Sequence, residues 1–103
     1  MEKKKSPAGP LEAQKLEALI RGRGDYAHIE VQARAGHLVI ESREGKDTKT
    51  TVARLTPLAG NLYGLSFCAH TGKWEPMPFT GPLEKIADDL LEALAPYLQR
   101  MDF

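Results

Sequence analysis

Between residues 26 and 79 the apolar residues recur with a period of two, and a segment with a helical period lies on each side of this block. The alternation begins at Ala27, Ile29, Val31 and Ala33, which is typical of a strand with one buried face. Ala35-Gly36 then predicts a tight turn. Pairing position 33 with 38 and position 31 with 40 keeps the apolar side chains together, so the block is expected to open with an antiparallel hairpin.

Two further strands are expected after a turn at Gly45-Lys46-Asp47. In the first of them, positions 51, 53 and 55 are expected on the core face, and Val52 and Arg54 on the opposite face. Tyr63, Leu65 and Phe67 alternate in the next strand. Placing position 55 opposite 65 requires an odd-length loop, which residues 59–61 supply with a glycine at the centre.

A last extended segment runs from Trp74 to Phe79, after a turn predicted at residues 70–73. Pro76 and Pro78 cannot donate hydrogen bonds to a neighbouring strand, so this segment is expected to be an edge strand or an extended arm. Depending on the length of the turn, either Trp74 or the pair Met77 and Phe79 would lie on the face opposite the core.

The flanking segments predict two amphipathic helices. Residues 10–21 begin with Pro10 and end before Gly22. The second helix shows the i, i+3, i+4, i+7 pattern throughout, at Leu83, Ile86, Ala87, Leu90, Leu91 and Leu94, and Pro96 is expected to kink or end it. The sequence therefore predicts an α+β fold, an antiparallel meander sheet of four or five strands with both helices on one face, in the order α-β-β-β-β-(β)-α.

Composition limits the classes of function. The 103 residues fit one domain, expected over residues 10–103 after a disordered basic tail at residues 1–9. Fourteen basic residues balance fourteen acidic ones, which argues against a binder driven by overall positive charge. The single cysteine and the lack of a signal-like or membrane-spanning apolar run predict a cytoplasmic protein, with no membrane association and no cofactor.

Residues 72–84, with the sequence GKWEPMPFTGPLE, resemble the closing segment of a group of small bacterial proteins of unknown function. This resemblance covers about an eighth of the chain and implies a bacterial cytoplasmic protein without implying an activity. The order of several antiparallel strands followed by a helix is also similar to the single-stranded nucleic-acid-binding domains of the coactivator and Pur type, in architecture alone.

Two helices can cover only one face of such a sheet, so the opposite face is the candidate binding surface. The candidate contacts are Val52, Arg54, Leu62, Cys68, Trp74, Met77 and Phe79. A mixed apolar and charged patch of this kind favours a non-enzymatic interaction or scaffold module, most simply one that self-associates as a homodimer or binds another protein. The alternative for Trp74 and Phe79 is that the final arm folds over and both become core residues.

A second hypothesis is a module that binds single-stranded nucleic acid. Tyr63, Trp74 and Phe79 would stack on bases, and Arg34, Arg43, Arg54 and Lys73 would contact phosphates.

Only two small clusters of residues could support catalysis, so no enzymatic activity is predicted. Cys68 and His70 lie two apart on a strand and could form a thiol and its base, although a buried structural cysteine is commoner. His28, Glu30 and Glu41 could approach one another on the first hairpin, with Glu30 opposite Glu41. An arginine between these carboxylates is a simpler expectation than a metal ion, because the ligand spacing matches no recognised motif.

Overall fold

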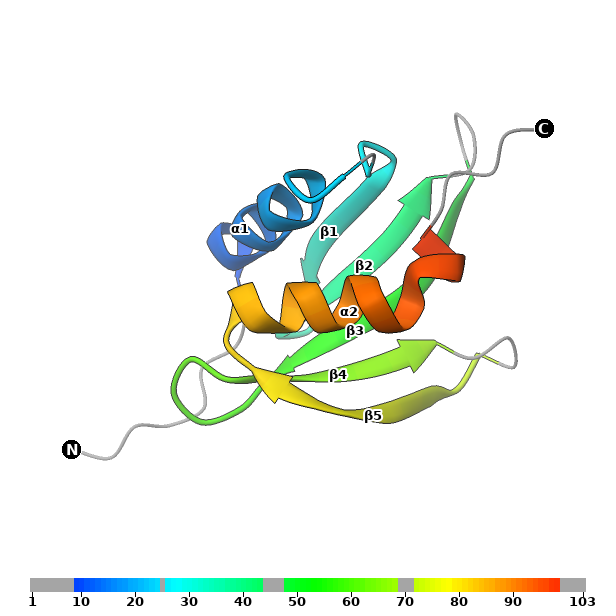
Figure 1. The fold of residues 1–103 in the computed structure, drawn as a ribbon. Helices are drawn as coiled ribbons and strands as arrows, with labels where there is room; N and C mark the ends of the chain where they lie inside the picture. The colour runs from blue at the N-terminus through cyan, green and yellow to red at the C-terminus, as the bar shows by residue number, and fades with distance from the viewer. Residues whose placement is uncertain (1–8, 25, 44–47, 69–71, 99–103) are drawn as a thin grey trace.

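The computed structural model describes residues 9–24, 26–43, 48–68 and 72–98, and it shows two helices and a five-stranded antiparallel sheet (Figure 1). In chain order the elements are α1 (Pro10–Arg21), β1 (Ile29–Arg34), β2 (His37–Arg43), β3 (Lys49–Pro57), β4 (Tyr63–Cys68), β5 (Trp74–Gly81) and α2 (Leu83–Leu98). The strands pair in the order β1-β2-β3-β4-β5, which makes β1 and β5 the edge strands. The predicted α+β meander is confirmed, and the final extended segment is its fifth strand.

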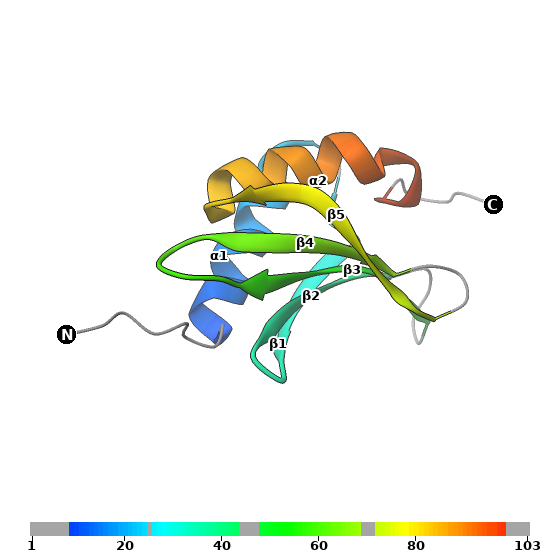
Figure 2. The same ribbon diagram turned by 90° about the horizontal axis from the view of Figure 1, so that it is seen from below.

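Both helices pack on the same face of the sheet (Figure 2). α1 lies against β1 and beside α2, and α2 lies over β4 and β5. The amphipathic pattern explains this arrangement, because the apolar stripe of each helix can be removed from water only against the apolar face of the strands. The largest fully buried side chains are Leu16, Ile20, Ile29, Leu38, Ile40, Leu55, Leu65, Ile86 and Leu90.

The first hairpin has the register that the alternation predicts, with Val31 opposite Ile40 and Ala33 opposite Leu38. Its turn has positive φ at both central residues, 50° at Ala35 and 82° at Gly36. Positive φ at both positions matches the right-handed twist of the strands that the turn joins. β1 starts later than the alternation suggests, because the N–H of Ile29 donates to the carbonyl of Tyr26 in a turn, at 3.0 Å.

The β3–β4 hairpin also has its predicted register, with Leu55 opposite Leu65. The N–H of Leu58 donates to the carbonyl of Leu62 at 2.8 Å, so residues 59–61 form the loop. Gly60 has φ of 69°, a conformation that a side chain makes costly. Leu62 therefore lies in this connection and is exposed there, outside the strand in which it was expected.

A bulge between β2 and β3 corrects the predicted position of Val52. Ile40 pairs with Ala53, whereas Glu41 pairs with Thr51, so Val52 is an extra residue on β3. An extra residue interrupts the alternation of faces. Val52 is consequently buried in the core cluster, and Thr51, predicted on the core face, stands opposite Glu41.

The pairing of β4 with β5 shows which side chains of β5 reach the open face, and its one irregularity adds two residues to β5, which leaves the alternation of faces unchanged. Cys68 pairs with Trp74 and Ser66 with Pro76, but the next pair joins position 64 to position 80. Met77 and Phe79 both pack against the core, and Pro78 between them is exposed. Of the two registers left open by the sequence, the structure has the one that places Trp74 on the open face.

Local signals set the helix ends. The N–H of Gly9 donates to Oε1 of Glu12 at 2.7 Å, which satisfies a backbone donor at the start of α1. α2 is kinked at Leu94, where φ is −114° and ψ is 17°, two residues before Pro96. The kink predicted for this proline is confirmed, since its missing N–H removes a helical hydrogen bond. Neither helix among the described residues is long and apolar enough to span a membrane.

Some predictions fall elsewhere in the chain. The basic tail up to residue 8, the turn at Gly45-Lys46-Asp47 and residues 69–71, including His70, lie outside the described residues.

Candidate binding face

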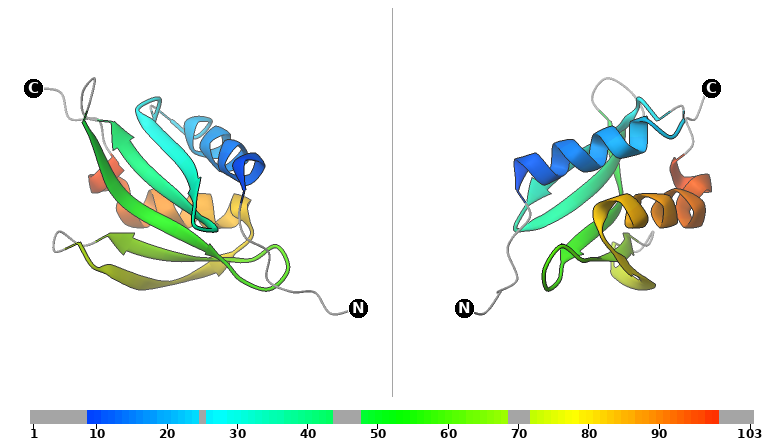
Figure 3. Two further views of the ribbon diagram at one scale, coloured as in Figure 1. Left: turned by 180° about the vertical axis from the view of Figure 1, so that it is seen from behind. Right: turned by 60° about the vertical axis from the view of Figure 1, so that its left-hand side comes forward.

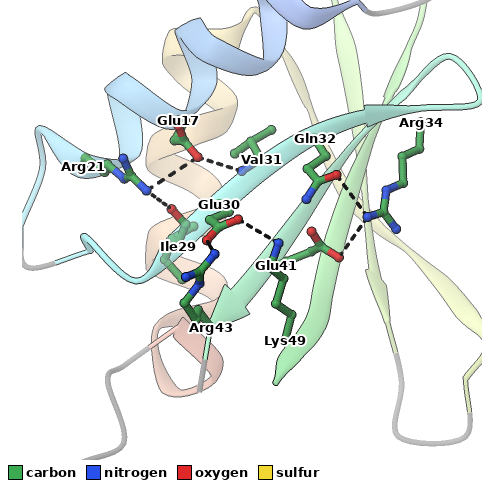
Figure 4. A network of polar contacts seen from close by, with 10 residues as sticks. All are labelled: Glu17, Arg21, Ile29, Glu30, Val31, Gln32, Arg34, Glu41, Arg43 and Lys49. Carbon is green, nitrogen blue, oxygen red and sulfur yellow. Dashed lines mark hydrogen bonds and ion pairs between the residues drawn. The ribbon is translucent and has the colours of Figure 1, made fainter. Parts of the chain in front are cut away.

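The outer edge of β1 is occupied by side chains of α1 (Figure 4). The N–H of Val31 donates to Oε1 of Glu17 at 3.1 Å, and Nη2 of Arg21 donates to the carbonyl of Ile29 at 3.0 Å. Glu17 and Arg21 also pair with each other at 3.6 Å. A strand edge with unpaired backbone groups is a template for another strand, so these contacts close β1 to strand addition.

The other edge strand, β5, carries two prolines. Pro76 and Pro78 have no N–H to offer to an incoming strand, which blunts this edge as well. With both edges protected and the helices on one face, the opposite face of the sheet is left without a covering element among the described residues. Figure 3 (left) shows that no helix crosses this open face.

At one end of the open face, Glu30 on β1 holds two cations. Its Oε2 lies 2.6 Å from Nη2 of Arg43, and its Oε1 lies 3.0 Å from Nζ of Lys49 (Figure 4). The hydrogen bond from Lys49, followed by the positive charge of Arg43, lowers the pKa of Glu30 below its ordinary value. Glu30 is therefore ionised at neutral pH and fixes both cations on the sheet.

Glu41 lies directly opposite Glu30, as predicted, and its nearest cation is Arg34. Nη2 of Arg34 donates to Oε1 of Gln32 at 3.0 Å and lies 3.7 Å from Oε2 of Glu41. Oε1 of Glu41 is buried and accepts no hydrogen bond from any described residue. Each of the two facing carboxylates thus has cations of its own, Arg34 beside Glu41 and Arg43 with Lys49 at Glu30.

The cations and the carboxylates of the open face differ in how exposed their side chains are. The cationic side chains are the more exposed ones, at 56% for Arg34, 47% for Arg43 and 34% for Lys49. The carboxylate side chains are only 22% exposed at Glu30 and 7% at Glu41. Because the anions lie below the cations, an approaching molecule meets a positive surface.

The helix layer has the opposite balance. Its described ionisable side chains are six carboxylates and four cations, namely Glu12, Glu17, Glu84, Asp88, Asp89, Glu92, Lys15, Arg21, Arg23 and Lys85. The described residues of the open face include four cations, with Arg54 as the fourth, against two carboxylates. Although the net charge of the chain is zero, its described charges are unevenly distributed, with an excess of cations on the open face and of carboxylates on the helix layer.

Arg54 and Trp74 form the aromatic part of the face. The guanidinium carbon of Arg54 lies 4.5 Å from the centroid of the Trp74 ring, which is cation–π geometry. Arg54 is on β3 and Trp74 on β5, and Arg54 pairs with the small Ser66 of β4, which leaves room for the side chain to cross that strand. Nε of Arg54 is buried and has no hydrogen-bond partner among the described residues.

The predicted contact residues therefore divide into two groups. Arg34, Arg43, Arg54, Cys68 and Trp74 do lie on the open face, and exposed Lys73 immediately precedes β5. Val52, Tyr63, Met77 and Phe79 belong to or pack against the core, and Leu62 lies in a loop, so none of these five contributes to the face. Alternation could not foresee the bulge that moves Val52, whereas the core position of Met77 and Phe79 belongs to one of the two registers that the sequence left open.

Tyr63 lies at a separate depression of about 260 Å³ between the starts of the two helices and the β3–β4 loop, where Leu11, Glu12 and Lys15 are also found. Burial, and secondarily the charge of Glu12, raises the pKa of the Tyr63 hydroxyl above its usual value. The polar rim is already engaged, because Lys15 lies 3.6 Å from Glu84 and Glu12 accepts from Gly9. Tyr63 is accordingly a core and rim residue and not a stacking platform.

Sequence reasoning missed three contributors to this arrangement. Lys49 follows a predicted turn and carries no pattern of its own, and Glu17 with Arg21 were assigned only to a helix surface. Their i, i+4 spacing with opposite charges was the available signal, since it places both side chains on one side of α1.

Nothing in the described part of the chain gathers three or more histidine, cysteine, aspartate or glutamate side chains into a group that could hold a metal ion. His28 is buried at the start of β1. Cys68 lies beside Trp74 on the open face, half-buried, and its proposed partner His70 lies outside the described residues.

Comparison with protein-family models, with curated proteins and with solved structures finds no significant match for this chain. The resemblance of residues 72–84 to small bacterial proteins therefore stays a prediction.

Proposed function

We propose that this protein is a non-enzymatic interaction module that binds an acidic partner through the open face of its sheet. The observation that carries the proposal is the difference in exposure on that face, where Arg34, Arg43 and Lys49 are more exposed than the carboxylates of Glu30 and Glu41. Such an arrangement attracts anions and is already organised before a partner arrives.

The closed edges support the same surface. Glu17 and Arg21 occupy the free edge of β1, and two prolines blunt β5, so recognition by strand addition is disfavoured. Trp74 and Arg54 add the residue types that dominate binding energy at interfaces.

The same geometry argues against self-association through this face. That hypothesis depended on an apolar patch, but Val52, Met77 and Phe79 contribute to the core side of the sheet. A symmetric face-to-face dimer would also bring the two sets of exposed cations together, which is unfavourable.

The test is the salt concentration at which the protein elutes from immobilised heparin, a generic polyanion. The variant Arg34→Gln/Arg43→Gln removes two charges from the open face, and the control Lys15→Gln/Lys85→Gln removes two from the helix layer. We expect the open-face variant to elute at clearly lower salt and the control to elute close to the wild type. Equal elution of both variants would contradict the proposal, as would a stable dimer in light scattering that is broken by open-face substitutions.

A further inference from the structure

We infer that the acidic partner is a single-stranded nucleic acid, with one base stacked on Trp74 and the backbone phosphates held by Arg34, Arg43 and Lys49. This inference rests on the proposed function and specifies its partner. The chemistry that points to it is the combination, on one open sheet face, of a fixed aromatic ring and a set of exposed cations.

The Trp74 ring is placed so that a base can stack on it. Arg54 lies over the ring at 4.5 Å and restrains it. Trp74, the one tryptophan of the chain, is only partly buried, so part of the ring is open to a ligand. β5 is an edge strand, so no further strand lies beyond the ring on that side. A planar base can add to this cation–aromatic pair and extend the stack, whereas a carboxylate side chain of an acidic protein gains nothing from the ring.

The distribution of charge across the strands fits an extended chain of phosphates. Arg34 and Arg43 lie on β1 and β2, Lys49 and Arg54 on β3, and Trp74 on β5. With strands about 4.8 Å apart, the five strands span roughly 19 Å, which is enough for several nucleotides crossing the sheet. A duplex would not fit this scheme, because its bases are stacked on one another and cannot reach the tryptophan.

Two orphaned polar atoms lie on the same face. Nε of Arg54 and Oε1 of Glu41 are buried without hydrogen-bond partners among the described residues. Buried polar groups without partners are costly. A ligand whose binding shifts the side chains of Arg54 and Arg34 can bring a phosphate oxygen to the donor Nε of Arg54 and a base N–H to the acceptor Oε1 of Glu41. The face is thus both charged and incompletely hydrogen-bonded.

The experiment is fluorescence anisotropy of a labelled oligothymidylate of about 15 nucleotides, a length at the upper end of common site sizes. At low salt we expect saturable binding and quenching of Trp74 fluorescence. Trp74→Leu is expected to weaken binding by about 5- to 150-fold, the usual range for one stacked base, while Trp74→Phe retains most of it. Arg34→Gln and Arg43→Gln are each expected to lower the slope of log K against log salt by about 0.7. Lys85→Gln is the helix-layer control and should change neither quantity.

A competition experiment distinguishes the failure of the nucleic-acid inference from the failure of the proposed acidic partner. Polyglutamate or a duplex of equal length that competes as well as the single strand would overturn the inference and leave the proposed acidic partner standing. Single-strand binding that Trp74→Leu does not weaken would also overturn it. Absence of binding to every polyanion at low salt would overturn both, and selective displacement by single strands would support both.

Discussion

Replacement of Ala35 by asparagine should stabilise the protein. Ala35 is the first residue of the β1–β2 turn and has φ of 50°, and no other non-glycine residue among those described has a positive φ. L-residues disfavour this region because Cβ approaches the carbonyl oxygen, whereas asparagine tolerates it. Ala35 is also exposed, so the substitution disturbs no packing.

The magnitude follows from the backbone conformation. The left-handed region costs an alanine about 1–2 kcal/mol, and asparagine should recover about 0.5–1 kcal/mol of this. For a domain of this length such a gain raises Tm by roughly 2–6 °C. Ala35→Gly should gain less, because the extra freedom of glycine in the unfolded chain offsets about 0.4–1 kcal/mol.

The assay is urea unfolding at constant temperature, with Ala59→Asn as the matched control. Ala59 is likewise an exposed alanine in a hairpin connection, but its φ is not positive. We expect a higher midpoint for Ala35→Asn and an unchanged one for Ala59→Asn. An equal shift in both variants, or none in Ala35→Asn, would refute the argument from backbone strain.

Three further predictions concern the β1 edge, the ion-pair cluster and the core. Glu17→Ala/Arg21→Ala uncovers the outer edge of β1 and should cost about 1–2 kcal/mol and promote oligomers, checked by urea unfolding and light scattering; an unchanged mass and stability would count against edge protection. Glu30 has a lowered pKa in the folded state, so its stabilising effect is present above its unfolded pKa, near 4.5, and is lost as pH falls through the lowered folded value. Glu30→Gln should therefore be less stable than the wild type at neutral pH, by about 0.5–1 kcal/mol, and the gap should close in acid; a gap independent of pH would contradict this. Leu90→Ala should cost about 2–5 kcal/mol because Leu90 is fully buried, whereas Leu11→Ala, at an exposed leucine on α1, should cost far less in the same urea assay, and similar losses would contradict the assigned core.

Residue patterning was sufficient for the elements and most of their pairing. The period-two block placed Val31 opposite Ile40 and Leu55 opposite Leu65, because a slip of one residue would turn every apolar side chain of a strand toward water. The helical pattern from Leu83 onward likewise determined the buried stripe of α2. Turn residues and prolines marked where these elements end.

The binding face itself was only partly predictable. Alternation assumes an unbroken ladder, and the bulge at Val52 breaks it, so this side chain, expected on the open face, is used in the core. The facing of Met77 and Phe79 depended on the length of the preceding turn, which alternation does not determine. The candidate face is in consequence more charged than the sequence suggested.

Local sequence determined this protein's helices, strands and hairpin registers, because these depend on periodicity and on residues close together in the chain. Tertiary structure alone decided the closed edge at Glu17 and Arg21, the meeting of Arg54 with Trp74 across β4, and the depth of the carboxylates below the cations. Each of these depends on contacts between residues on different elements, whose distances and burial are set by how the helices and strands pack.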